Sequence, residues 1–123
     1  GRDLRQAFLA LRSEFLEICR GRVDVIEQNL SKINSGSEAG AISDALDSIK
    51  NEAHTIAGSS GTYGYADVSK SARDLEMLCI RFLDEGTSKM DEARIEEFTK
   101  SVTRVCEEST RMFADPDSGK IPF

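Results

Sequence analysis

The stretch AHTIAGSSGTYGY, from Ala53 to Tyr65, contains the single histidine of the chain and three of its nine glycines. It continues an apolar pattern in which residues recur at steps of three and four, which is typical of one face of an α-helix. The pattern predicts a helix from about residue 38 or 41 to about residue 61, followed by a turn around Gly64. The members of the apolar stripe are Ile42, Leu46, Ile49, Ala53 and Ile56.

The segment before this helix contains two apolar series that are out of phase by one position. The sequence leaves two arrangements open: a short first helix joined to a longer second one near Ser13, or one long helix that turns a new face to its neighbours. The first series, which marks one face of a helix, is Leu4, Phe8, Leu11, Phe15 and Ile18, and the second is Leu16, Cys19, Val23, Ile26, Leu30 and Ile33.

Two further apolar stripes follow the turn at Gly64. One runs from Val68 to Phe82 and the other from Ile95 to Met112, and each predicts a helix. Glycines and polar residues mark the expected boundaries: Gly36 and Gly86 as helix ends, and Ser37, Ser88 or Asp91 as helix caps.

Composition limits the class of protein. A chain of 123 residues with 39% hydrophobic residues is long enough for one hydrophobic core. The net charge of −6 argues against nucleic acid or an anionic membrane as a partner. No apolar run approaches the roughly 20 residues that span a bilayer. We therefore expect one cytoplasmic domain, and we interpret Cys19, Cys79 and Cys106 as buried thiols rather than disulfide or metal ligands.

Short connections between amphipathic helices force neighbouring helices to run in opposite directions. The predicted fold is therefore all-α: an antiparallel up-down four-helix bundle over residues 1–113, with the short N-terminal helix as an open addition. Residues 114–123 contain Asp-Pro-Asp-Ser-Gly, and this composition predicts a linker-like or disordered tail.

His54 lies on the margin of the apolar stripe. At about 100° per residue it sits roughly 120° from the centre of the stripe, so we expect it to face outward. The same arithmetic puts Lys50, Ala57, Gly58 and Gly61 on its side of the helix. Glycine inside a helix costs roughly 1 kcal/mol relative to alanine. The two glycines either clear the approach to an exposed imidazole or mark an early helix end, and the spacing alone leaves both open.

The run from His54 to Tyr65, followed by Val68 and by Ala-Arg-Asp-Leu-Glu at 72–76, resembles the signature of the histidine-containing phosphotransfer (HPt) domain. The resemblance implies that His54 accepts a phosphoryl group on Nε2 from a histidine kinase or a receiver-domain aspartate and passes it to another receiver aspartate. Neutral imidazole is abundant near pH 7 and its nitrogen is a competent nucleophile. A carrier of this kind is not an enzyme, has no ATP site, and needs no cofactor because Mg²⁺ belongs to the receiver domain.

The resemblance also assigns roles to other residues. Glu76 matches the position of a glutamate that holds the histidine Nδ1. Many members of the family carry a lysine where this chain has Ala57, and Lys50, one turn before His54, is a candidate substitute. The expected surface for receiver docking and phosphate access comprises Lys50, Ala57, Gly58, Gly61 and Tyr63.

Two other classes of function stay open beside the phosphotransfer reading. The first is a bundle that docks receiver domains without accepting phosphate. The second is a hydrolase with His54 as general base, which the sequence disfavours because no serine or cysteine nucleophile accompanies the histidine. Whether the chain is a phosphotransfer module or only a docking module, we expect it to be monomeric and to have no metal site.

Overall fold

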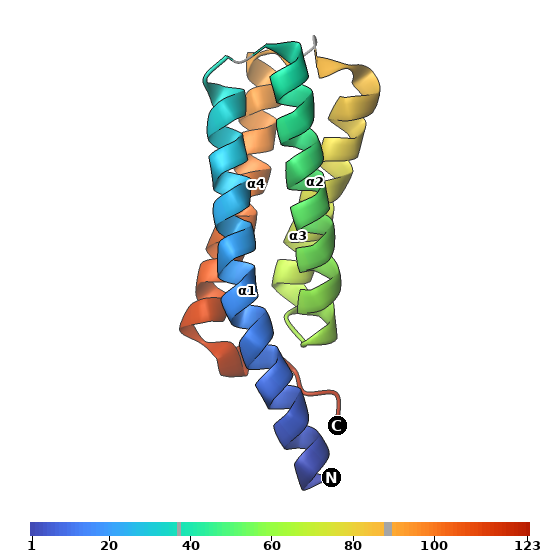
Figure 1. Cartoon of the computed structure of the whole chain (residues 1–123), viewed down its shortest axis with the longest axis vertical. Coiled ribbons are helices and arrows are strands. Elements are labelled where there is room, and N and C mark those ends of the chain that lie inside the picture. Colours follow the sequence, from blue (N-terminus) through green and yellow to red (C-terminus); the bar gives the residue numbers. More distant parts are fainter. Residues whose placement is uncertain (37, 88–89) are drawn as a thin grey trace.

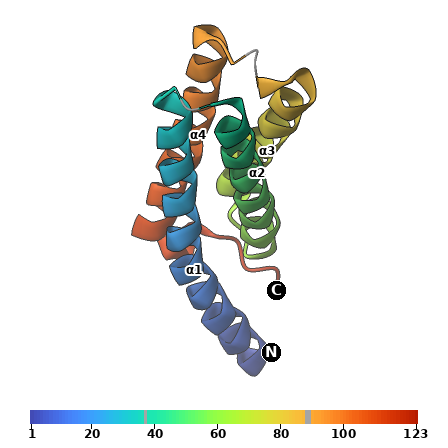
Figure 2. The same ribbon diagram turned by 45° about the horizontal axis from the view of Figure 1, so that its top comes forward.

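The computed structural model describes residues 1–36, 38–87 and 90–123, and the regular secondary structure of this part of the chain is helical, without a strand. Four long helices run alternately up and down (Figures 1 and 2). Each helix packs on the next in the chain, and α1 also packs on α4, so the four close into a bundle. The predicted all-α four-helix bundle is confirmed. Its elements are α1 (Arg2–Asn34), α2 (Ala39–Thr62), α3 (Ala66–Glu85), α4 (Glu92–Ala114) and the short 3₁₀ helix η2 (Pro116–Ser118).

The core follows the apolar stripes of α2, α3 and α4. Leu46, Ile49 and Ile56 of α2 have no exposed surface, and Phe82 of α3 packs its ring 6.0 Å from that of Phe98 in α4. Burial of one such side chain contributes about 1.5–3 kcal/mol. The predicted stripes of these three helices therefore hold the bundle together, although Ile42 and Ile95 are only partly buried.

The N-terminal segment forms one continuous helix, which is the second of the two arrangements open from the sequence. Three members of the first apolar series face solvent: Leu4, Leu11 and Ile18 are 57%, 52% and 58% exposed. Figure 1 shows the first turns of α1 extending past the ends of the other three helices, where no neighbouring helix covers them. Leu11 and Ile18 instead line a cleft beside α2. The inward face of α1 instead carries Arg12 and Phe15.

The C-terminal tail packs against the bundle, which differs from the linker-like or disordered tail expected for residues 114–123. Arg12, only 4% exposed, donates a hydrogen bond to the carbonyl of Gly119 at 3.2 Å. Tyr65 donates its hydroxyl to the carbonyl of Pro116 at 2.6 Å, and the Lys120 N–H donates to the carbonyl of Gly64 at 3.1 Å. A buried guanidinium needs acceptors, and the tail supplies them.

The ends of the helices agree with the predicted boundaries where these are described. Gly36 and Gly86 have positive φ angles of 75° and 92°. Asp91 caps α4, because its Oδ1 accepts a hydrogen bond from the Arg94 N–H at 2.9 Å. The other two predicted caps, Ser37 and Ser88, lie outside the described residues.

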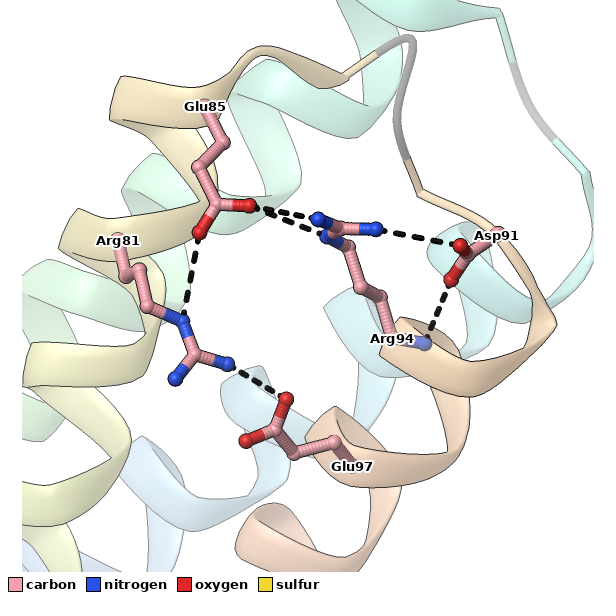
Figure 3. Close-up of polar contacts among 5 residues, drawn as sticks. All are labelled: Arg81, Glu85, Asp91, Arg94 and Glu97. Atoms are coloured by element: carbon pink, nitrogen blue, oxygen red, sulfur yellow. Dashed lines mark hydrogen bonds and ion pairs between the residues drawn. The ribbon is translucent and has the colours of Figure 1, made fainter.

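A charged network joins α3 to α4 at the end of the bundle remote from the tail (Figure 3). Arg94 lies between Glu85, at 2.8 Å, and Asp91, at 3.1 Å. Arg81 extends the network from Glu85 to Glu97, at 3.6 Å and 2.5 Å. Hydrogen bonds to carboxylates raise the pKa of Arg94 above its ordinary value. Exposed pairs of this kind each contribute only about 0–1 kcal/mol, so the network orients the α3–α4 connection more than it stabilises the fold.

The three cysteines are free thiols. Cys19 and Cys79 are buried as predicted, whereas Cys106 is only partly buried and lies 3.6 Å from a carboxylate oxygen of Glu27. Burial raises the pKa of Cys19 to about 11 and that of Cys79 to about 12. These two thiols are therefore protonated, and thus unreactive, at neutral pH.

We expect Gly64→Ala to lower the free energy of unfolding. Gly64 has φ +88°, and a Cβ atom there would lie 2.0 Å from the carbonyl oxygen of Lys120. Holding alanine in this left-handed backbone conformation costs about 1–2 kcal/mol. The clash with Lys120 adds to this cost because it displaces the tail. Urea denaturation measures the change.

Gly21→Ala is the matched control, because a Cβ atom at this position in α1 meets nothing within 4 Å. It should raise the free energy of unfolding by up to about 1 kcal/mol through helix propensity. Equal effects of the two substitutions would contradict the contact between the tail and the α2–α3 turn.

Candidate functional site

His54 projects from α2 with its side chain 74% exposed and meets Glu76 of α3. The Nδ1 atom of His54 lies 2.6 Å from Oε2 of Glu76, whose side chain is 14% exposed. A carboxylate only accepts hydrogen bonds, so the proton of this contact lies on Nδ1. The neutral ring then carries its lone pair on Nε2, which has no hydrogen-bond partner among the described residues.

The close packing of α2 on α3 sets the register of this pair. The Ser69 hydroxyl of α3 donates to the carbonyl of Ala57 in α2 at 2.7 Å. A Cβ atom at Gly61 would lie 3.2 Å from Oγ of Ser69, which is tighter than usual packing. Gly61 follows His54 by seven residues along α2, and Ser69 precedes Glu76 by seven residues along α3. Because the two helices are antiparallel, the contact between Gly61 and Ser69 places His54 and Glu76 at the same level.

The structure separates the predicted docking residues into different environments. Ala57 is 2% exposed and belongs to the core, so the expectation that it faces outward is wrong. The apolar face of α2 is wider than the stripe read from the sequence, and Ala57 fills the side of it toward α3. Gly61 is exposed, and its lack of a side chain serves the approach of Ser69. At Gly58 a Cβ atom would meet nothing within 4 Å, so the surface beside His54 is open there.

Lys50 lies one turn before His54 and is bound to a carboxylate of its own helix. Its Nζ atom is 2.9 Å from Oδ1 of Asp47, and this hydrogen bond raises the pKa of Lys50 above its ordinary value. Lys50 was the candidate substitute for the lysine that many family members carry at the position of Ala57. Asp47 partly neutralises the positive charge of Lys50.

Tyr63 is only partly buried and belongs to an aromatic cluster at the α2–α3 turn. Its ring centroid lies 5.3 Å from that of Phe15 and 5.5 Å from that of Phe8, both of α1. Phe8 in turn meets Phe123 edge to face at 5.6 Å. The cluster joins the turn, the first half of α1 and the end of the tail.

An apolar cleft between α1 and α2 was missed by the sequence reasoning. Leu11 and Ile18 of α1 line it together with Thr55 and Ser59 of α2, so it runs beside the ridge that carries His54. Two charged residues of α1, Glu14 and Arg22, also line it. The signal was present in the sequence, because Leu4, Leu11 and Ile18 are spaced seven residues apart and share one helix face. The helical period alone does not tell whether such a face is buried or exposed.

Residues 1–36, 38–87 and 90–123 contain no group of three or more His, Cys, Asp or Glu side chains that could hold a metal ion. In the same ranges, no helix combines the length and the apolar character needed to cross a membrane.

The structure thus combines an antiparallel four-helix bundle with an exposed histidine that a glutamate of the neighbouring helix contacts at Nδ1. The family model for the Hpt domain matches residues 10–108, and the chain therefore belongs to this family. No curated protein and no solved structure matches the chain significantly. Hpt domains are phosphocarrier modules rather than enzymes, and they act in histidine phosphotransfer of two-component systems with kinases and receiver domains.

We expect the His54–Glu76 contact to control the tautomer of the imidazole. In ¹⁵N NMR spectra of the neutral ring, Nδ1 should carry the proton in the unaltered chain, and Glu76→Ala should give a mixture of both tautomers. Glu76→Gln is the matched control, because its amide oxygen still accepts from Nδ1 without a charge. A mixture of tautomers in the unaltered chain would show that Glu76 does not orient the ring.

Proposed function

We propose that this chain carries a phosphoryl group on Nε2 of His54 between a kinase or receiver aspartate and another receiver aspartate. The observation that carries the proposal is the Nδ1 contact with Glu76 at 2.6 Å, on an imidazole that is 74% exposed. This arrangement leaves the nucleophilic nitrogen at the surface, where a second protein can reach it. Membership of the Hpt family supports the same chemistry.

The transfer step uses the lone pair of Nε2. It attacks the phosphorus of an aspartyl phosphate on the partner; the N–P bond forms, the P–O bond breaks, and the aspartate leaves as a carboxylate. The proton on Nδ1 stays in place, so the ring becomes positively charged. Glu76 stabilises that charge, since a fixed carboxylate favours a cation that develops beside it. Transfer to the next receiver reverses these bond changes.

The proposed docking surface for the receiver includes the apolar cleft beside His54. Leu11 and Ile18 are more than half exposed and line the same cleft, so a partner that covers the cleft would remove apolar surface from water. Gly58 supplies the flat approach to the ring that the sequence predicted, whereas the buried side chain of Ala57 is not part of this surface. The proposed partner thus contacts α1 and α2 on either side of the cleft.

His54→Gln should abolish phosphorylation of the chain. After mixing with a phosphorylated receiver domain, the unaltered chain should carry acid-labile, base-stable label, and His54→Gln should carry none. Glu76→Ala should lower the rate of labelling by about tenfold or more, within the range for loss of one electrostatic contact to developing charge.

The controls separate the remaining classes of function. Incubation with ATP alone should leave the chain unlabelled, because the sequence has no ATP-binding motif. A chain that binds the receiver but never takes up label would be a docking module only, and the proposal would then be wrong. An unchanged labelling rate in Glu76→Ala would remove Glu76 from the mechanism.

Gly58→Leu should block phosphotransfer without unfolding the bundle. A leucine at this open position extends over the approach to His54, and we expect the rate of transfer to fall by at least about tenfold. Gly58→Ala is the control: it should raise the free energy of unfolding by up to about 1 kcal/mol and leave the rate nearly unchanged. If Gly58→Leu folds and transfers phosphate at the original rate, the surface around Gly58 is not covered by the partner.

A further inference from the structure

A basic hollow of about 460 Å³ lies between α2 and α3, on the side of His54 opposite the apolar cleft. Lys70 and Arg73 of α3 line it together with Lys120 of the tail, and no carboxylate is among its lining residues. The rest of the lining consists of Gly61, Gly64, Ala66 and Ser69. Three cations around one hollow stand out in a chain with a net charge of −6.

The cations of the hollow are mostly free to meet a partner. The side chains of Arg73 and Lys120 are exposed, and in the described part of the chain they form no ion pair or hydrogen bond. Lys70 pairs with Asp74 at 3.2 Å, but its side chain is 77% exposed. By contrast, Lys50, the basic residue one turn from His54, is engaged with Asp47.

The register of the helices links the hollow to the phosphoacceptor. Arg73 precedes Glu76 by three residues on α3, and Gly61 follows His54 by seven residues on α2. At 1.5 Å per residue these offsets correspond to about 4.5 Å and about 10 Å along the helix axes. The hollow therefore begins roughly one helical turn from the His54–Glu76 pair, within reach of any domain that covers the imidazole.

The contacts of the folded tail fix the position of Lys120. Its N–H is bound to the carbonyl of Gly64, and Gly119 packs against the ring of Tyr65. Arg12 holds the carbonyl of Gly119 from the bundle interior. The same contacts that order the tail thus add a cation to the α2–α3 seam, beside two cations that α3 already contributes.

We propose that this hollow binds the carboxylate-rich rim of the receiver domain that exchanges phosphate with His54, and that Arg73 and Lys120 determine its affinity and choice of partner. The inference rests on the proposed function. A domain that takes a phosphoryl group on aspartate presents that carboxylate together with the one or two carboxylates that hold its Mg²⁺. Complementary charges at the edge of an interface steer association and suppress wrong partners. The apolar cleft and the basic hollow then flank His54 on opposite sides.

The test is an NMR titration of the ¹⁵N-labelled His54→Gln chain with each receiver domain of the host, in Mg²⁺. Binding is thereby measured without transfer. The amides of Gly61, Ser69, Arg73 and Lys120 should shift, and the double variant Arg73→Glu/Lys120→Glu should bind at least about tenfold more weakly at low ionic strength. The difference should shrink in 0.5 M salt, because salt screens exposed charges.

The matched control is Lys100→Glu, an exposed position on α4 whose lysine pairs with Glu96. It reverses one charge away from the α2–α3 seam and should leave binding unchanged. Receivers that bind without shifts at the hollow, or with equal affinity for the double variant, would overturn the inference and leave the proposed function standing. Receivers that bind through the hollow but never label His54 of the unaltered chain would overturn the proposed function and leave the hollow as a docking site for receivers. Binding by no receiver would overturn both.

Discussion

The close antiparallel packing of α2 on α3 is the constraint on which the rest of the site depends. The Ser69 hydroxyl reaches the backbone of α2 at Ala57, and Gly61 lacks the side chain that would push α3 away. This contact sets the level at which His54 meets Glu76. A change of register by one residue would turn one of the two side chains by about 100° and separate them. A contact between small residues therefore determines the chemistry of the imidazole.

The ordered tail stabilises the turn that connects the same two helices. Arg12, Tyr65 and Gly64 all bind tail backbone atoms, and the rings of Phe8, Tyr63 and Phe123 cover the contact. Arg12 is nearly buried, and a buried guanidinium without acceptors would cost several kcal/mol. The tail is thus part of the domain and supports both the fold and the basic side of the candidate site.

The two flanks of His54 differ in chemistry. On one side α1 exposes Leu11 and Ile18 above a cleft, and on the other side Lys70, Arg73 and Lys120 surround a hollow. Apolar contact and charge complementarity make separate contributions to recognition: burial supplies affinity, and charge supplies orientation and selectivity. A divided surface of this kind suits the specific but short-lived complexes that the proposed phosphoryl transfer requires.

The sequence by itself determined the helical bundle, the stripes of α2, α3 and α4, the exposed position of His54 and the resemblance that pointed to Glu76. These follow from periodicity and local motif, which depend on neighbours along the chain. Only the tertiary structure decided that Ala57 is buried, that Leu4, Leu11 and Ile18 are exposed, and that Lys120 lies beside Arg73. Each of these depends on which distant segment covers a given helix face, and the period of a helix carries no information about its neighbours in space.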